Sequence, residues 1–115
     1  DKVIDIRNGT LTNGEAVQLM SNLNTTAQHF KVNDLGNGYW SIINVNSNKA
    51  IEVENASTSD GAKLQQNTYT GATNQQWKFI AAAINIIAQE DLHGCYRRKG
   101  PLFVEISVCE MRCNA

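Results

Sequence analysis

The sequence has no excess of charge of either sign, no long hydrophobic run and almost no proline. Its 115 residues include ten basic and eleven acidic side chains, for a net charge of −1, and a single proline. The most apolar window, residues 79–88 (FIAAAINIIA), is far shorter than the roughly 20 apolar residues that a membrane-spanning helix needs. A nucleic-acid-binding surface would require a basic excess, which this composition does not provide. We therefore expect one soluble globular domain that neither binds nucleic acid nor inserts into a membrane.

Cysteine is also scarce, and it is confined to one end of the chain. Cys95, Cys109 and Cys113 all lie near the C-terminus, so a disulfide bond would stabilise that end alone. The same cysteines with His93 form an alternative zinc set, but neither a Cys-x-x-Cys motif nor a histidine pair gives it the usual ligand spacing. A disulfide bond is therefore the favoured interpretation, and no cofactor is expected.

The start of the chain and its Asn-x-Ser/Thr motifs are the features of the sequence that bear on cellular location. The chain opens directly on the charged and branched DKVIDIR, which is not a signal peptide. Asn8, Asn24 and Asn55 stand in motifs that accept glycans in a secretory pathway, although chance matches are equally expected in a chain rich in Asn, Ser and Thr. A leader that has been removed and a leader that never existed are both compatible with this sequence.

An internal repeat with a period of 47 residues organises the chain. Residues 2–32 align without a gap over residues 49–79, with Asn8 over Asn55 and Gln18 over Gln65. The segment TNQQWKF near the end of the second copy has TAQHFKV as its counterpart in the first. A fixed period of this length indicates an array of supersecondary units.

Each unit has the pattern of short β-strands separated by turns. Apolar residues alternate with polar ones in VIDI, AIEV and AVQLM, which is the period of strands with one buried face. The polar clusters between them end on Asn13-Gly14 and Asp60-Gly61, dipeptides that accept the positive φ of tight turns. The sequence therefore predicts an all-β fold built from repeated hairpins.

The third unit is fainter, and its first segment is ambiguous. Residues 84–88 (INIIA) align with residues 40–44, and the alternation in residues 104–108 indicates a strand. A helix is the alternative for the apolar run, with Gly94 as its candidate C-cap. The residues that recur at helical spacing are Ile80, Ala83, Ile84 and Ile87. We divide the single domain (residues 1–115) into a first lobe that lacks its opening strand, a second lobe and a degenerate third lobe, at residues 1–37, 38–80 and 81–115.

These units resemble the ricin-type β-trefoil lectin domain, which occurs in plant toxin B chains and in carbohydrate-binding modules of bacterial glycosidases. The resemblance rests on VIDIRNGTLTNGEAVQLM with TAQHF and on AIEVENASTSDGAKLQQ with TNQQW, so it covers residues 1–80 far better than the rest. It implies a β-trefoil-like fold with two recognisable lobes and a truncated, degenerate third lobe. It also implies structural roles for the Gln-x-aromatic residues, whose amides satisfy buried backbone groups and whose rings fill the core. These residues are Gln28, Phe30, Gln75 and Trp77.

In the first lobe the resemblance implies a partial sugar site. Asp5 takes the position of the family's carboxylate, and Gln18 that of its polar partner. Met20 stands where the family has an aromatic platform, and Ala27 where it has an asparagine. The first lobe is therefore expected to be the poorer site.

In the second lobe more of the family's sugar-binding positions match. Glu52 is the carboxylate, Gln65 its partner and Asn74 the asparagine, whereas Asn67 stands at the platform position. Tyr69 lies two residues beyond Asn67 and so is expected to point to the same strand face, where it would partly replace the missing ring. We expect this lobe to be the better site.

The third lobe is not expected to bind sugar. Arg97 stands at the carboxylate position and Ser107 at the platform position. Cys95 and Cys109 fall where the family often has a disulfide bond within a lobe, which leaves Cys113 outside that pair.

The expected function is non-catalytic carbohydrate binding by a lectin or module of a secreted protein or toxin, with a galactoside or xylan-like glycan as partner. The missing aromatic platforms favour an alternative, a trefoil that has lost sugar binding and serves as a protein-contact or structural subunit of a toxin or hydrolase complex. A glycosidase pair of Asp5 and Glu52 is disfavoured, because equivalent positions of symmetric lobes lie on different faces of the fold. The missing opening strand and missing third motif lead us to expect that another chain or a second copy completes the fold.

Overall fold

The fold was analysed in a computed structural model, which describes residues 1–80, 88–90, 96–99, 105–108 and 110–114. These residues form β-strands joined by short 3-10 turns and contain no α-helix, so the predicted all-β class is confirmed. None of their helical segments is long and apolar enough to cross a membrane. The first lobe contains β1 (Lys2–Ile6), β2 (Val17–Ser21) and β3 (Phe30–Asp34). The second contains β4 (Trp40–Asn44), β5 (Ala50–Val53), β6 (Leu64–Asn67) and β7 (Trp77–Ile80).

The 47-residue repeat of the sequence is also a repeat of structure. The turn η1 (Arg7–Gly9) corresponds to η3 (Glu54–Ala56), and η2 (Thr26–Gln28) corresponds to η4 (Thr73–Gln75). At the centre of the first pair, Asn8 and Asn55 have φ angles of 59° and 55°. Asparagine tolerates this left-handed conformation better than most residues, which explains its presence at both positions.

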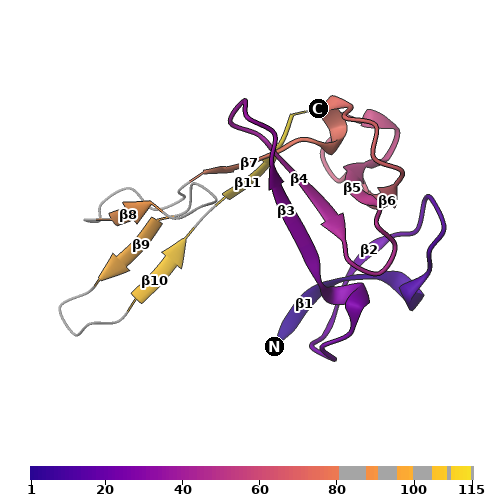
Figure 1. Cartoon of the computed structure of the whole chain (residues 1–115), viewed down its shortest axis with the longest axis horizontal. Helices are drawn as coiled ribbons and strands as arrows, with labels where there is room; N and C mark the ends of the chain where they lie inside the picture. Colours follow the sequence, from indigo (N-terminus) through magenta and orange to yellow (C-terminus); the bar gives the residue numbers. More distant parts are fainter. Residues whose placement is uncertain (81–87, 91–95, 100–104, 109, 115) are drawn as a thin grey trace.

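The strands pair as hairpins. In the hairpin of β1 and β2, Asp5 lies opposite Gln18, and in the hairpin of β5 and β6, Glu52 lies opposite Gln65. The larger sheet has the order β11-β7-β4-β5-β6, where β11 is Glu110–Cys113, and β3 pairs with β4 (Figure 1).

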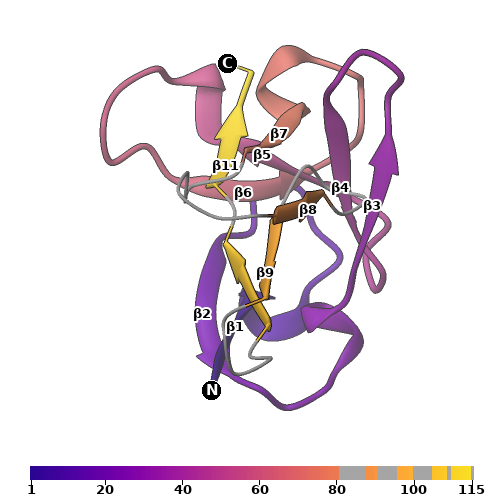
Figure 2. The ribbon, with the colours of Figure 1, turned by 90° about the vertical axis from the view of Figure 1, so that its left-hand side faces the viewer.

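The last part of the chain forms two pieces, a separate sheet and an edge strand of the larger sheet. One piece consists of β8 (Ala88–Glu90), β9 (Tyr96–Lys99) and β10 (Glu105–Val108), and it lies away from the first two lobes (Figure 1). The other is β11 (Glu110–Cys113), which runs antiparallel beside β7 (Figure 2). Ile80 closes strand β7, whereas the rest of the segment for which a helix was the alternative, residues 81–87, lies outside the described residues.

Alternate residues of the strands meet in one hydrophobic core. Its buried members are Ile6, Ile42, Ile51, Val53 and Trp77, and Val17, Phe30, Leu64 and Phe79 pack against them. Each large apolar side chain buried in this way contributes about 1.5–3 kcal/mol to folding. Because the core draws on both lobes, the two lobes fold against each other.

A buried amide, Gln66, joins the two lobes. Its Nε2 donates to the carbonyls of Thr10 and Thr12 at 3.0 and 2.8 Å, and its Oε1 accepts from Ser47 Oγ at 2.7 Å. Its backbone adds two bonds to the same first-lobe loop, from Gly14 N at 2.8 Å and to the carbonyl of Glu15 at 2.9 Å. The loop between β1 and β2 therefore covers the second hairpin.

Candidate functional site

Each of the first two lobes contains a buried carboxylate that is bound by two glutamine amides. In the first lobe, Gln18 Nε2 donates to Asp5 Oδ1 at 3.0 Å and Gln28 Nε2 donates to Asp5 Oδ2 at 3.1 Å. Two amide donors satisfy the charge that burial would otherwise leave without hydrogen bonds, because a buried carboxylate needs such partners.

The second lobe repeats this cluster with a longer carboxylate. Gln65 Nε2 donates to Glu52 Oε2 at 3.0 Å, and Gln75 Nε2 donates to Glu52 Oε1 at 2.9 Å. Asp5 and Glu52 are both buried, with exposures of 7% and 5%. The carboxylate and its partner predicted from the sequence are therefore brought together in both lobes.

The motif glutamines also hold the backbone that follows each hairpin. Gln28 donates to the carbonyl of Ser21 at 3.0 Å and accepts from Leu23 N at 2.9 Å. Gln75 donates to the carbonyl of Thr68 at 2.9 Å and accepts from Thr70 N at 2.8 Å. Each amide thus connects the carboxylate to the loop beside it, and the structural role expected of these glutamines includes positioning the carboxylate.

The two clusters differ in how many acceptor sites remain. A carboxylate has about four lone-pair sites. In the second lobe Asn67 Nδ2 also donates to Glu52 Oε2 at 3.3 Å, whereas the first-lobe counterpart of Asn67 is Met20, which has no donor. Asp5 accepts two side-chain hydrogen bonds and Glu52 accepts three among the described residues. Asp5 therefore keeps more capacity to accept bonds from a ligand.

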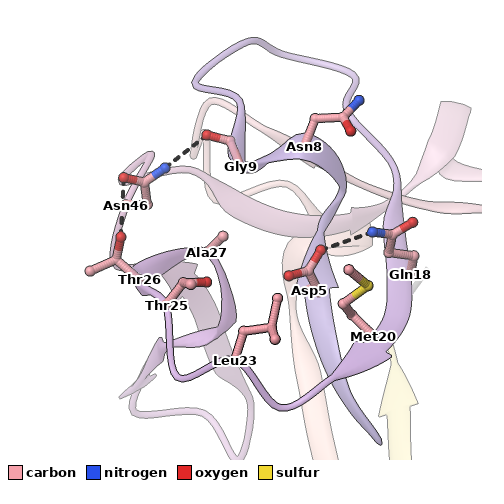
Figure 3. A pocket seen from close by; sticks show the side chains of 10 residues that line it. All are labelled: Asp5, Asn8, Gly9, Gln18, Met20, Leu23, Thr25, Thr26, Ala27 and Asn46. Atoms are coloured by element: carbon pink, nitrogen blue, oxygen red, sulfur yellow. Dashed lines mark hydrogen bonds between the residues drawn. The ribbon is translucent and has the colours of Figure 1, made fainter.

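A hollow of about 380 Å³ opens beside Asp5 (Figure 3). Met20 and Leu23 form an apolar wall, with exposures of 39% and 58%. The other wall is polar, where Asn46 donates to the Gly9 carbonyl at 3.0 Å and accepts from Thr26 Oγ1 at 3.3 Å. The remaining lining residues are Asn8, Gln18, Thr25 and Ala27. Apolar and polar walls around a carboxylate suit a ligand with both hydroxyl groups and an apolar face.

Asn46, Leu23 and Thr25 were missed by the sequence reasoning. Asn46 belongs to the turn between β4 and β5 in the second lobe, and reaches the first-lobe site only through the packing of the lobes. Leu23 and Thr25 lie between the hairpin and the Gln-x-aromatic motif, where no pattern marks them. The nearest available signal for Asn46 was its place in the polar turn that directly precedes the second copy of the repeat.

Asn74 and Tyr69 lie differently from the other predicted second-lobe residues. Asn74 is 9% exposed, and its Nδ2 donates to the Val53 carbonyl at 2.9 Å. Strand β6 ends at Asn67, so strand alternation does not extend to Tyr69, whose side chain is 39% exposed. Sugar contacts by these two residues stay predictions, as does the ranking of the second lobe above the first.

The aromatic residues of the two motifs lie in or against the core. Trp77 is 4% exposed, and its Nε1 donates to the Ile51 carbonyl at 3.1 Å, while Phe30 packs against the core from the first lobe. Cys95 and Cys109 lie outside the described residues, and so do His93 and the predicted disulfide bond. Among the described residues no group of three or more His, Cys, Asp or Glu side chains is placed to hold a metal ion.

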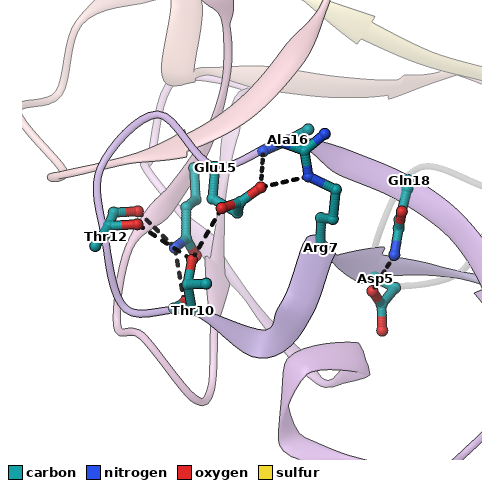
Figure 4. A network of polar contacts seen from close by, with 8 residues as sticks. Asp5, Arg7, Thr10, Thr12, Glu15, Ala16 and Gln18 are labelled. Atoms are coloured by element: carbon teal, nitrogen blue, oxygen red, sulfur yellow. Dashed lines mark hydrogen bonds and ion pairs between the residues drawn. The ribbon is translucent and has the colours of Figure 1, made fainter.

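The pKa of Glu15, which lies in this region, is perturbed by its neighbours (Figure 4). Its pKa is lowered from the usual 4.5, first because Arg7 Nε donates to Glu15 Oε1 at 2.7 Å. Partial burial opposes this effect, and hydrogen bonds from Ala16 N and Thr10 Oγ1 add to it. The ionised carboxylate thus fixes both ends of the loop that covers the second lobe.

Paired hairpins at a fixed period, each with a carboxylate held by the glutamine of a Gln-x-aromatic motif, define a β-trefoil domain of the lectin type. Residues 26–90 match the family described as ricin-type β-trefoil lectin domain-like, which is more than half of the chain. The chain belongs to this family.

Two solved structures are similar over 99% of this chain. The designed three-fold symmetric protein ThreeFoil matches with a TM-score of 0.70 and 29% identity, over 83% of its own length. An exo-β-1,3-galactanase from Clostridium thermocellum matches with a TM-score of 0.68 and 26% identity. This chain spans only 25% of that galactanase. No curated protein sequence matches significantly.

Proposed function

We propose that the chain is a non-catalytic carbohydrate-binding module whose principal site is the first-lobe hollow. The observation that carries this proposal is the Asp5 carboxylate, which borders the hollow with acceptor sites left after binding Gln18 and Gln28. A carboxylate that accepts sugar hydroxyls orients a ring, while Met20 and Leu23 bury part of its apolar face.

The galactanase supports a galactoside as the first ligand to test, because its chain includes a region similar to this one. Xylan-like glycans are the second class. A module that binds such polymers would act outside the cell. A secreted or extracellular location is therefore part of the proposal.

The test compares glycan binding by the wild-type chain and by variants of the two lobes. We expect Asp5→Asn to weaken binding about tenfold or more, because a hydrogen bond to a charged acceptor is worth about 1.5–3 kcal/mol. Leu23→Ala and Met20→Ala should weaken it less, through lost burial. Glycan-array binding followed by calorimetry measures these effects, and circular dichroism checks that each variant is folded.

Glu52→Gln is the matched control in the second lobe, and it should leave binding nearly unchanged. If Glu52→Gln abolished binding and Asp5→Asn did not, the second lobe would be the site, as the sequence ranking predicts. Binding to no glycan would exclude the lectin function.

The alternative of a protein-contact subunit rests on one observation. No aromatic side chain lines the hollow among the described residues, so stacking on a sugar ring is missing there. Detection of glycan binding through Asp5 would reject this alternative for the first-lobe site.

A further inference from the structure

The hairpins of the two lobes differ in what covers them. In the second lobe, Ile51 and Gln66 face each other across β5 and β6, with exposures of 2% and 0%. Their first-lobe counterparts, Ile4 and Leu19, also face each other, but their exposures are 41% and 71%. Equivalent positions are thus buried in one lobe and exposed in the other. We call Lys2, Ile4, Leu19 and Ser21 the open face.

The second-lobe hairpin is covered by the loop of the preceding lobe. Gly14 N donates to the Gln66 carbonyl, and Gln66 N donates to that of Glu15, along the outer edge of β6. Asn13 Oδ1 accepts from Thr68 N at 3.0 Å and from Thr68 Oγ1 at 3.2 Å. Within the described residues β2 pairs only with β1, so the corresponding edge of the first lobe has no such cover.

The chain carries a second copy of the covering loop, in the second lobe. Asp60 and Gly61 are the counterparts of Asn13 and Gly14, and all four residues are exposed. Gly61 has the same left-handed conformation as Gly14, with φ angles of 79° and 86°. The loop of residues 57–63 therefore has the conformation of the covering loop, and among the described residues no backbone hydrogen bond joins it to the edge of another hairpin.

The third unit differs from the first two in the length of the connection between its hairpin strands. Residues 7–16 join the strands of the first hairpin and residues 54–63 those of the second, whereas β9 and β10 are separated only by residues 100–104. This connection has half as many residues as the other two. The second lobe of another molecule carries a loop of the full length.

We propose that the chain associates head to tail, with the 57–63 loop of one copy on the open face of the next. The register follows from the contact between the lobes: Gly61 N would donate to the Leu19 carbonyl, and Leu19 N to that of Ala62. Asp60 would accept from Ser21, where Asn13 accepts from Thr68. Lys2 Nζ donates to Ser21 Oγ at 3.1 Å. The Lys2 ammonium group would therefore lie close to the Asp60 carboxylate of the next copy. Charge complementarity at this point favours a second copy as the occupant.

A contact between two different patches is heterologous, so repeated association gives a ring or an open chain of molecules. The first test is the solution mass in the absence of any glycan, by sedimentation equilibrium across micromolar to millimolar concentrations. We expect the average mass to rise above the 12.7 kDa of one chain as concentration increases. Leu19→Lys should weaken association about tenfold or more, because it places a charge at the centre of the contact. A mass that stayed at that of one chain would overturn the proposal.

Leu11→Lys is the matched control, since Leu11 is a leucine of similar exposure, 59%, outside the open face and the 57–63 loop. It should leave association unchanged. Equal loss in both variants would indicate nonspecific adhesion of apolar side chains and would contradict the proposed contact.

Two further sets of variants test the register. Lys2→Asp and Asp60→Lys should each weaken association by like-charge repulsion, and the double variant should restore it. Leu19→Gln should keep or strengthen association, because Gln66 donates to loop carbonyls from the equivalent position. Failure of the double variant to restore association, or a loss in Leu19→Gln as large as in Leu19→Lys, would exclude this register. Since none of these measurements uses a glycan, their outcome is independent of the proposed sugar site.

Discussion

At the scale of single residues, amide side chains make many of the buried hydrogen bonds in this protein. Gln28 and Gln75 each join a buried carboxylate to a loop. Asn44, which is fully buried, donates to the carbonyls of Ala27 and His29 at 3.1 and 3.3 Å. Neutral amides offer donors and an acceptor together, so they satisfy mixed backbone groups without the cost of burying a charge.

The ion pair of Arg7 and Glu15 gives a pH-dependent prediction. Because the folded pKa of Glu15 is lowered, its contribution to stability is present above the unfolded value of about 4.5 and is lost as pH falls through the folded value. Carboxyl NMR titration should show Glu15 titrating below its usual pKa. In Arg7→Gln the titration should move upward, since the largest cause of the shift is removed.

The effect on overall stability should be small, because the pair is solvent-screened. A Glu15 pKa that did not move in Arg7→Gln would show that this hydrogen bond does not set it.

The residues of the candidate site could be predicted only in part from sequence. The resemblance to the lectin family marked Asp5 and Gln18 as site positions, and the repeat aligns them with Glu52 and Gln65 in an equivalent hairpin. Asn46 was not, because it approaches the hollow from another lobe. A repeat reports what each unit has in common, whereas contacts between units depend on packing.

At the scale of elements, the strands of the first two lobes follow the sequence pattern closely. Alternation fixed which residues face the core, and Gly14 and Gly61 have the expected positive φ, but they lie in ten-residue connections and not in tight hairpin turns. The third unit was less predictable, because a short apolar run fits a strand or a helix and has no Gln-x-aromatic motif to set its register. Strand β11 illustrates the difference, because residues 110–113 (EMRC) alternate polar and apolar side chains, yet this short pattern does not specify that the strand pairs with β7.

Exchanging glycine and alanine at equivalent positions of the turns η1 and η3 should change the free energy of unfolding in opposite directions. Ala56 has a φ of 50°, whereas its counterpart Gly9 has a φ of 58°. A left-handed conformation costs about 1–2 kcal/mol for a residue with a Cβ, but little for glycine. We therefore expect Ala56→Gly to raise the free energy of unfolding by about 0.5–1 kcal/mol and Gly9→Ala to lower it by about 1 kcal/mol. Urea denaturation of both variants measures the difference.

Each variant serves as the control for the other, since both exchange the same two residue types in the same kind of turn. Destabilisation by Ala56→Gly would mean that the flexibility gained by the unfolded chain outweighs the relieved backbone strain. The Cβ added by Gly9→Ala would lie 3.7 Å from that of Ala27, an ordinary contact, so the expected loss comes from the backbone and not from a clash.

At the scale of the whole molecule, the first two lobes share a core and one polar junction. Ile6 from the first lobe packs with Ile42, Ile51 and Trp77 from the second. Gln66 and the loop of residues 10–15 connect the same lobes by hydrogen bonds. A small domain built in this way should unfold as one cooperative unit.

Replacing the amide at this junction tests that cooperativity. Gln66→Leu keeps the approximate volume but leaves the carbonyls of Thr10 and Thr12 and the hydroxyl of Ser47 without this partner. We expect a loss of about 2–4 kcal/mol in the free energy of unfolding. The midpoint should fall equally when it is measured by the fluorescence of Trp40 and Trp77 in the second lobe and by amide NMR signals of β1 and β2 in the first. Leu19→Gln, at the exposed equivalent position, should leave the stability of the dilute single chain almost unchanged. If only the second-lobe signal shifted in Gln66→Leu, the lobes would unfold separately, and the shared core would be too weak to couple them without this one amide.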